Sequence, residues 1–232
     1  MPYKKTMETE NDLKHLKGVL FDMDGVLVDS MTHHLQSWKE LLEYFDISVS
    51  DTFIFEHEGA MSLEVIRDVF AIKGFSITDE EISHIYAWQN ARFQEAYLHK
   101  VDFYPEALSL LTQLNAKGLL IGLVTSSRMN LVEKIWNPEA LSLFSTIVTA
   151  DDVDRYKPHP DPYLKALSRI QREAGDCLVI ENAPAGIQAA RAAGISCYAV
   201  ASTLPEEKLT GAQRVFSDLS ALRLFFSKQV LS

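Results

Sequence analysis

The chain alternates short, nearly unbroken apolar runs with longer segments in which apolar residues recur at helical spacing. Five apolar runs are rich in β-branched residues: Gly18–Phe21, Leu119–Val124, Thr146–Thr149, Cys177–Ile180 and Ile195–Val200. Such runs are typical of parallel strands that are covered on both faces. Helical segments lie between them: Pro105–Ala116, Asn130–Trp136, Asp161–Gln171 and Ala185–Ala193. Gly118, Gly175 and Gly194 stand where helices should end before the next strand. The alternation predicts an α/β fold with a doubly wound, mainly parallel sheet.

Residues 31–102 break this alternation. They keep helical spacing, as in the apolar faces at residues 65–72 and 82–97, and contain no convincing parallel strand. We therefore expect an α/β core domain of residues 1–30 and 103–232, and an all-helical domain of residues 31–102 inserted after the first strand. The insert holds 11 of the 23 aromatic residues, and we expect most of them to form its own small core.

The composition of the chain excludes several classes of protein. With 47% apolar residues, 10 Gly and 8 Pro among 232 residues, the chain can bury a core, which excludes disorder. A net charge of −10 leaves no basic surface for nucleic acid or an anionic membrane. Cys177 and Cys197 lie in apolar runs and are expected to be buried free thiols. The polar N-terminus and the lack of a long apolar run predict a cytoplasmic protein with no membrane contact.

Two carboxylates follow the first predicted strand, in the segment Asp22-Met-Asp24-Gly25. At the carboxyl end of a parallel strand both would project into the crevice where α/β sheets bind ligands. The pair could hold Mg²⁺, or one carboxylate could act as a nucleophile while the other moves a proton. A calcium-binding loop does not fit, because the glycine is fourth instead of sixth and position 12 is His33. Taken alone, the segment could also be a solvated turn.

Polar residues follow three later apolar runs: Thr125, Ser126 and Ser127 after the second, Lys157 in a proline-rich loop after the third, and Glu181 with Asn182 after the fourth. The hydroxyls suit phosphoryl oxygens, and the lysine could be a fixed positive charge. The acid and the amide could reach a metal, although Asn182 could equally cap the next helix. All these residues follow the carboxyl ends of predicted parallel strands, directly or in the next loop. Because those ends lie at the same edge of the sheet, the residues would converge on one crevice. Together they predict phosphoryl transfer.

With these motifs in this order, residues 18–217 resemble the haloacid dehalogenase superfamily, in the subgroup with a helical cap after the first strand. That subgroup holds phosphoglycolate-phosphatase-like and β-phosphoglucomutase-like enzymes. The resemblance implies that Asp22 attacks phosphorus and forms an aspartyl-phosphate. It implies that Asp24 protonates the leaving oxygen and then deprotonates water. Thr125 and backbone N–H groups near Ser126 would hold the phosphoryl group, and Lys157 would neutralise charge on it and on Asp22.

The resemblance also implies Mg²⁺ as the cofactor, bound by the Asp22 carboxylate, the Asp24 carbonyl oxygen and the residue at Asn182, with Glu181 acting through water. The Glu-Asp pair common in the family reads Glu181-Asn182 here. An amide oxygen lacks formal charge, so we expect weaker metal binding unless another carboxylate helps. Glu58 in the inserted segment is the candidate helper, and a solvated loop acid is the alternative.

The inserted domain bears on the choice between a hydrolase and a mutase. His34, Trp38 and Ser30 fall where β-phosphoglucomutase-like sequences carry similar residues, and His34 and Ser127 are candidate substrate contacts. However, residues 59–62 lack the arginine with which such mutases grip the second phosphate. The insert also contains five basic and 13 acidic residues, which disfavours a bisphosphate.

These features favour hydrolysis of a small phosphorylated metabolite by a protein that is a monomer or a weak homo-oligomer. A sugar-phosphate mutase is the first alternative and an inorganic pyrophosphatase the second. A 2-haloacid dehalogenase is less favoured, because Asp24 is usually absent from such enzymes. A non-enzymatic binding role is also disfavoured, because the catalytic motifs are nearly intact.

Overall fold

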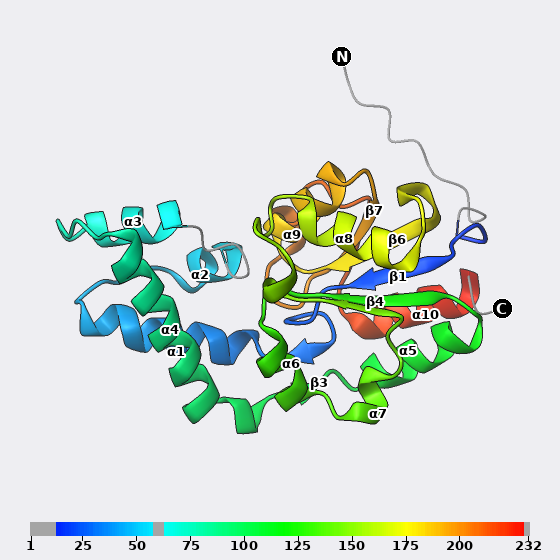
Figure 1. The fold of residues 1–232 in the computed structure, drawn as a ribbon, viewed down its shortest axis with the longest axis horizontal. Helices are drawn as coiled ribbons and strands as arrows, with labels where there is room; N and C mark the ends of the chain where they lie inside the picture. Colours follow the sequence, from blue (N-terminus) through cyan, green and yellow to red (C-terminus); the bar gives the residue numbers. More distant parts are fainter. Residues whose placement is uncertain (1–12, 58–62, 230–232) are drawn as a thin grey trace, which may run out of the picture.

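The computed structural model describes residues 13–57 and 63–229 and contains a six-stranded parallel sheet (Figure 1). The strands are β1 (Gly18–Phe21), β4 (Leu120–Val124), β5 (Thr146–Val148), β6 (Cys177–Glu181), β7 (Ser196–Val200) and β8 (Arg214–Phe216). Their order in the sheet is β5-β4-β1-β6-β7-β8, so the chain winds outward in both directions from β1. This order confirms the predicted doubly wound fold. The short edge strand β8 was not predicted from the sequence.

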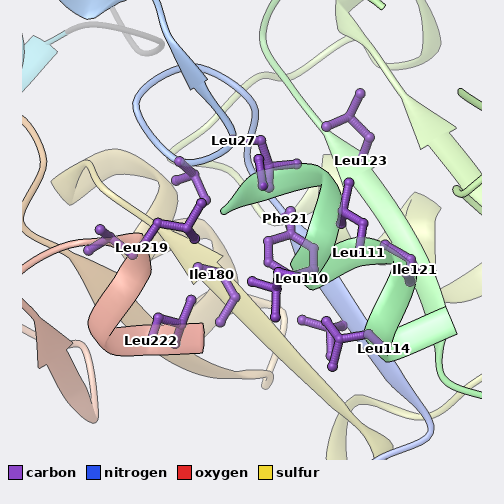
Figure 2. Packing of buried hydrophobic residues seen from close by; sticks show 14 of the residues in the cluster. Phe21, Leu27, Leu110, Leu111, Leu114, Ile121, Leu123, Ile180, Leu219 and Leu222 are labelled. Atoms are coloured by element: carbon purple, nitrogen blue, oxygen red, sulfur yellow. The ribbon is translucent and has the colours of Figure 1, made fainter. Parts of the chain in front are cut away.

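Helices cover both faces of the sheet (Figure 1). One face carries α5 (Ala107–Ala116), α6 (Met129–Ile135), α7 (Pro138–Leu141) and α10 (Leu219–Gln229), and the other carries α8 (Asp161–Ile170) and α9 (Pro184–Ala192). The side chains of β1 alternate between these layers, because Val19 and Phe21 pack in the first and Leu20 in the second. Figure 2 shows Phe21 and Ile180 of the sheet beneath leucines of α5 and α10. The sheet is therefore buried on both sides, as its unbroken apolar strands require.

Two of the three predicted glycine helix ends agree with the structure. Gly118 and Gly194 follow α5 and α9 with φ of 79° and 75°, a conformation that favours glycine. The prediction for Gly175 is wrong. Helix α8 ends at Ile170, and Gln171 takes the left-handed conformation with φ of 54°, whereas Gly175 lies in the 3₁₀ turn η3 (Ala174–Asp176).

Residues 31–100 contribute only helices among the described residues: α1 (Met31–Tyr44), α2 (Asp51–His57), α3 (Leu63–Ala71), α4 (Asp79–Ala96) and the 3₁₀ turn η1 (Leu98–Lys100). Their buried side chains, among them Trp38, Ile54, Phe70 and Ile82, form a hydrophobic cluster separate from those of the sheet. The chain enters and leaves this helical part through β2 (Val28–Asp29) and β3 (Asp102–Phe103), which pair antiparallel. The two connections therefore lie side by side, next to the first strand of the sheet.

The helical part also touches the α/β part directly. Phe55 of α2 packs against the cluster formed by the sheet with α8 and α9. The next residue of α2, Glu56, forms an ion pair with Lys208, which lies in the 3₁₀ turn η4 (Glu206–Lys208). Its Oε1 is 2.8 Å from Lys208 Nζ. Phe55 is thus an aromatic residue of the insert that packs on the α/β layer instead of joining the cluster of its own helices. No helix within the described ranges is long and apolar enough to cross a bilayer.

Candidate active site

Three neighbouring strands bring the predicted motifs together. Strand β1 lies between β4 and β6. Asp22 and Thr125, which follow β1 and β4, and Glu181, which ends β6, therefore stand at one edge of the sheet. Asp22 extends the pairing of β1, since its backbone N–H donates to the Ile180 carbonyl at 3.0 Å. The chain then turns sharply at Gly25, whose φ is 78°. The fold therefore brings polar residues that are far apart in the sequence to the same edge of the sheet.

Lys157 is the centre of a buried ion-pair network. Its ammonium donates to Asp22 Oδ1 at 2.7 Å, to Glu181 Oε1 at 2.7 Å and to the Val124 carbonyl at 3.0 Å. These three bonds use all the donors of a lysine. Burial opposes its charge, but the Asp22 and Glu181 carboxylates outweigh burial and raise the pKa of Lys157. The lysine is therefore a fixed positive charge beside Asp22.

Glu181 is the second carboxylate that binds this lysine. Its Oε1 accepts from Lys157 and from the Tyr163 hydroxyl, and its Oε2 accepts from the backbone N–H groups of Asn182 and Ala183. Gly186 of α9 leaves room for this carboxylate, because a Cβ there would lie 1.7 Å from Oε1. Each oxygen thus has two donors within the protein. The structure gives Glu181 direct contacts to the lysine, in addition to the water-mediated metal role that the resemblance implied.

Asp24 is surrounded by neutral donors and an imidazole. Ser30 Oγ donates to its Oδ1 at 2.5 Å, Ser127 Oγ donates to its Oδ2 at 3.1 Å, and His34 Nε2 lies 3.6 Å from Oδ1. Burial opposes ionisation of Asp24, but these groups, His34 foremost, hold its pKa below the ordinary value. Ser30 and His34 lie at the start of α1, and the His34 ring stacks on Phe93 of α4. The helical part therefore contributes directly to the surroundings of Asp24, and His34 contacts this residue.

The hydroxyl residues after β4 shape the neighbouring loop. Thr125 is buried, its N–H donates to the Val148 carbonyl at 2.9 Å, and its Oγ1 accepts from the Ser127 N–H at 3.0 Å. Thr125 thereby sets the turn that carries Ser126 and Ser127 past Asp24. Ser126 is half-buried.

Asn182 provides an unused acceptor. Its Oδ1 is buried without a hydrogen-bond partner within the described part of the chain, while its Nδ2 donates to Thr203 Oγ1 at 3.2 Å. Gly25 lies against this amide, because a Cβ there would be 2.0 Å from Nδ2. An orphaned buried acceptor is costly unless a ligand satisfies it, so Asn182 fits a cation site next to the turn after β1.

The charge of the site also fits a divalent cation. Asp22 and Glu181 are buried carboxylates and Asp24 is half-buried, whereas Lys157 is the buried lysine among them. Burial raises the pKa of Asp22 to about 7, with Lys157 opposing the rise and the other two carboxylates adding to it. No three His, Cys, Asp or Glu side chains form a metal cluster in the residues described. A hard cation would therefore draw on the Asp22 carboxylate together with amide and backbone oxygens.

Magnesium binding should strengthen as pH rises. Because the pKa of Asp22 is raised to about 7, its carboxyl is largely protonated below that pH, and the proton must leave before a cation binds. Each pH unit below the pKa should weaken Mg²⁺ binding up to about tenfold. We expect the increase in melting temperature caused by Mg²⁺ to grow from about pH 6 to about pH 8. An increase that is equal or larger at the acidic end would contradict this prediction, and Asp22→Asn should remove the dependence.

One predicted site residue cannot be placed: Glu58 lies outside the described residues. The sequence reasoning missed Tyr163, Gly186 and Thr203, which contact Glu181 or Asn182. Tyr163 could have been suspected, because it follows the lysine loop in the first turn of the next helix. The contacts of Gly186 and Thr203 depend on how distant segments pack.

The chain is similar to several known proteins over most of its length. The family model described as haloacid dehalogenase-like hydrolase matches residues 19–200. The validoxylamine A 7'-phosphate phosphatase of Streptomyces hygroscopicus subsp. limoneus is 33% identical, over 89% of this chain and 96% of that protein. The β-phosphoglucomutase of Bacillus subtilis is 30% identical, over 90% and 92% of the two chains. A solved structure of a hydrolase from Pseudomonas syringae is 28% identical, with a TM-score of 0.80, over 93% of this chain and all of the other.

Proposed function

Because the chain belongs to the haloacid dehalogenase-like hydrolases, we propose that it is a Mg²⁺-dependent phosphatase that acts on a small phosphorylated metabolite through an aspartyl-phosphate. The observation that carries the proposal is the contact between Asp22 and Lys157. A buried carboxylate whose Oδ1 lies 2.7 Å from a fully engaged ammonium is held in place as a nucleophile. The Lys157 ammonium binds Oδ1 of this carboxylate, and its other two hydrogen bonds go to Val124 and Glu181.

Two proton transfers are assigned to Asp24. In the first step Asp22 attacks phosphorus, the bond from phosphorus to the leaving oxygen breaks, and Asp24 gives that oxygen a proton. In the second step water attacks the phosphorus of the aspartyl-phosphate and gives one proton to Asp24, and the bond from phosphorus to the Asp22 oxygen breaks, which releases phosphate and restores the Asp22 carboxylate. The low pKa of Asp24 in the free protein suits the second step, so Asp24 must take up a proton before the first.

The remaining residues bind and orient. Thr125 and the loop through Ser126 and Ser127 hold the phosphoryl oxygens, and Lys157 supplies positive charge on one side of them. Asp22, the Asp24 carbonyl and Asn182 would hold Mg²⁺, which, when bound, would neutralise charge on the phosphoryl group. His34 lies on the helical side of the site, with its Nε2 3.6 Å from Asp24 Oδ1, and is the candidate contact for the leaving group.

The charges of the helical part favour hydrolysis over mutase chemistry. Each of its cations already has an acidic or aromatic neighbour: Lys39 with Asp51, Arg67 with Asp79, Lys73 with Asp46, Arg92 with Glu40, and Lys100 with the Tyr97 ring. Gripping the second phosphate of a bisphosphate would require breaking such a pair beneath an acidic domain. A neutral, hydroxyl-rich leaving group needs no such cation. The phosphatase relative from Streptomyces supports this preference, and the mutase of Bacillus subtilis remains the rival.

The test is phosphate release from a panel of compounds, with and without Mg²⁺. The panel contains sugar and polyol monophosphates, phosphoglycolate, nucleoside monophosphates and pyrophosphate. We expect Mg²⁺-dependent release, fastest with a monophosphate of a neutral polyol or sugar. Interconversion of sugar 1- and 6-phosphates without net release would support the mutase, and release mainly from pyrophosphate would support the pyrophosphatase.

Asn182 should limit the affinity for magnesium. Asn182→Asp adds a negative charge at the orphaned Oδ1 position, so we expect the half-saturating Mg²⁺ concentration to fall about 3–10-fold. Asn182→Leu removes the oxygen and should raise that concentration by at least about tenfold. Mg²⁺ titrations followed by phosphate release and by melting temperature measure both effects. Unchanged titrations in both variants would exclude Asn182 as a ligand.

A further inference from the structure

Tyr163 is a buried polar group that the steps above do not use. It stands in the first turn of α8, and its side chain is fully buried. Its hydroxyl lies 2.9 Å from Glu181 Oε1, and Lys157 Nζ lies 5.3 Å from the centroid of its ring, within the range of a cation–π contact. Tyr163 therefore contacts both members of the Glu181–Lys157 ion pair.

The direction of this hydrogen bond follows from chemistry. An ionised carboxylate can only accept, so the Tyr163 hydroxyl donates. Burial, with the neighbouring carboxylates adding to it, raises the pKa of Tyr163 well above its ordinary value, so the hydroxyl keeps its proton. Glu181 Oε1 thus shares its negative charge between two donors, Tyr163 and Lys157.

Lys157 lies between two carboxylates that compete for it, with Asp22 and Glu181 oxygens both at 2.7 Å. Without the Tyr163 hydroxyl, Glu181 Oε1 would have one donor fewer and would attract the ammonium more strongly. The ammonium would then move toward Glu181, and its contact with Asp22 would weaken. We propose that Tyr163 is a positioning residue that acts through Glu181 to hold the Lys157 ammonium against Asp22. The proposal rests on the proposed function, because it concerns the same reaction.

The test is Tyr163→Phe, which removes one oxygen and keeps the ring. We expect kcat to fall about tenfold, while KM and the half-saturating Mg²⁺ concentration stay within about twofold. In a Glu181→Gln background the same substitution should change kcat by less than about twofold, because the charge that Tyr163 shares is gone. Tyr198→Phe is the matched control, since Tyr198 is buried among Phe216 and Phe225 on the other face of the sheet. We expect it to keep the wild-type kcat.

A second readout does not need turnover. Beryllium fluoride with Mg²⁺ mimics a phosphoryl group on a carboxylate, and its binding should raise the melting temperature less in Tyr163→Phe than in the wild type. A wild-type kcat in Tyr163→Phe, or an equal loss with and without the Glu181 charge, would overturn the proposal. So would an equal loss in Tyr198→Phe. A wild-type protein that neither releases phosphate nor responds to beryllium fluoride would instead contradict the proposed function.

Discussion

Asp22→Asn is expected to fold and to lose at least about 10⁴-fold in phosphate release. The amide has the shape of the carboxylate, and its oxygen can still accept the hydrogen bond from Lys157 that Asp22 Oδ1 accepts at 2.7 Å. It cannot act as an anionic nucleophile toward phosphorus. It also removes one negative charge from a buried cluster in which burial already raises the pKa of Asp22 to about 7. The melting temperature without Mg²⁺ should therefore be unchanged or higher.

The matched control is Asp29→Asn. Asp29 lies on β2, seven positions further along the same segment, and its side chain is exposed. The Tyr104 hydroxyl donates to its Oδ1 over a long distance, 3.4 Å. We expect this variant to keep phosphate release within about twofold of the wild type. Residual Asp22→Asn activity above about one per cent would show that another group attacks phosphorus.

The second large effect is expected from Gly186→Ala, in the first turn of α9, five residues after Glu181. A Cβ at this position would lie 1.7 Å from Glu181 Oε1 and 2.0 Å from its Cδ, so the carboxylate must move. Its movement breaks the contacts with Lys157 and Tyr163 and releases the ammonium from its place beside Asp22. We expect phosphate release to fall about 10²-fold and the free energy of unfolding to fall by about 1–3 kcal/mol.

Gly175→Ala controls for the same chemical change. Nothing lies within 4 Å of a Cβ at Gly175, and its φ is not in the left-handed region. Denaturant unfolding and steady-state kinetics of both variants measure the two effects, and Gly175→Ala should match the wild type in both. A Gly186→Ala protein with wild-type kinetics would show that the position of Glu181 does not govern the site.

Local pattern was sufficient to predict most of the fold. The strands of the sheet centre are continuous apolar runs because both of their faces are covered, and their order along the chain fixed the α/β class. Strand β8 was missed because Arg214–Phe216 is a three-residue edge strand with one exposed and one half-buried position. The periodicity placed the end of α8 within one residue, but the role given to Gly175 was wrong, because the left-handed residue that follows the helix is Gln171 and not a glycine. The packing of Phe55 against the α/β layer depends on contacts between distant segments, which periodicity does not record.

For the candidate site, too, the sequence predicts some features and not others. Asp22, Asp24, Lys157 and Asn182 could be selected from the sequence because each follows a strand or a stiff loop whose end can be predicted. The partners of these residues could not. That Glu181 faces Lys157 and Tyr163, and that Asn182 has its Oδ1 unpaired, follows from side-chain directions set by α8, α9 and the loop after β7.

The most direct measurement of the central claim is to trap the phosphoryl group on the protein. The Asp24→Ala variant, which lacks the base for hydrolysis, is incubated with Mg²⁺ and acetyl phosphate, whose leaving group needs no proton, and is then quenched in acid. Peptide mapping by mass spectrometry should find one phosphoryl group on the peptide that contains Asp22, and none in the Asp22→Asn, Asp24→Ala double variant. A phosphoryl group on another residue, or in equal amount in the double variant, would contradict the account.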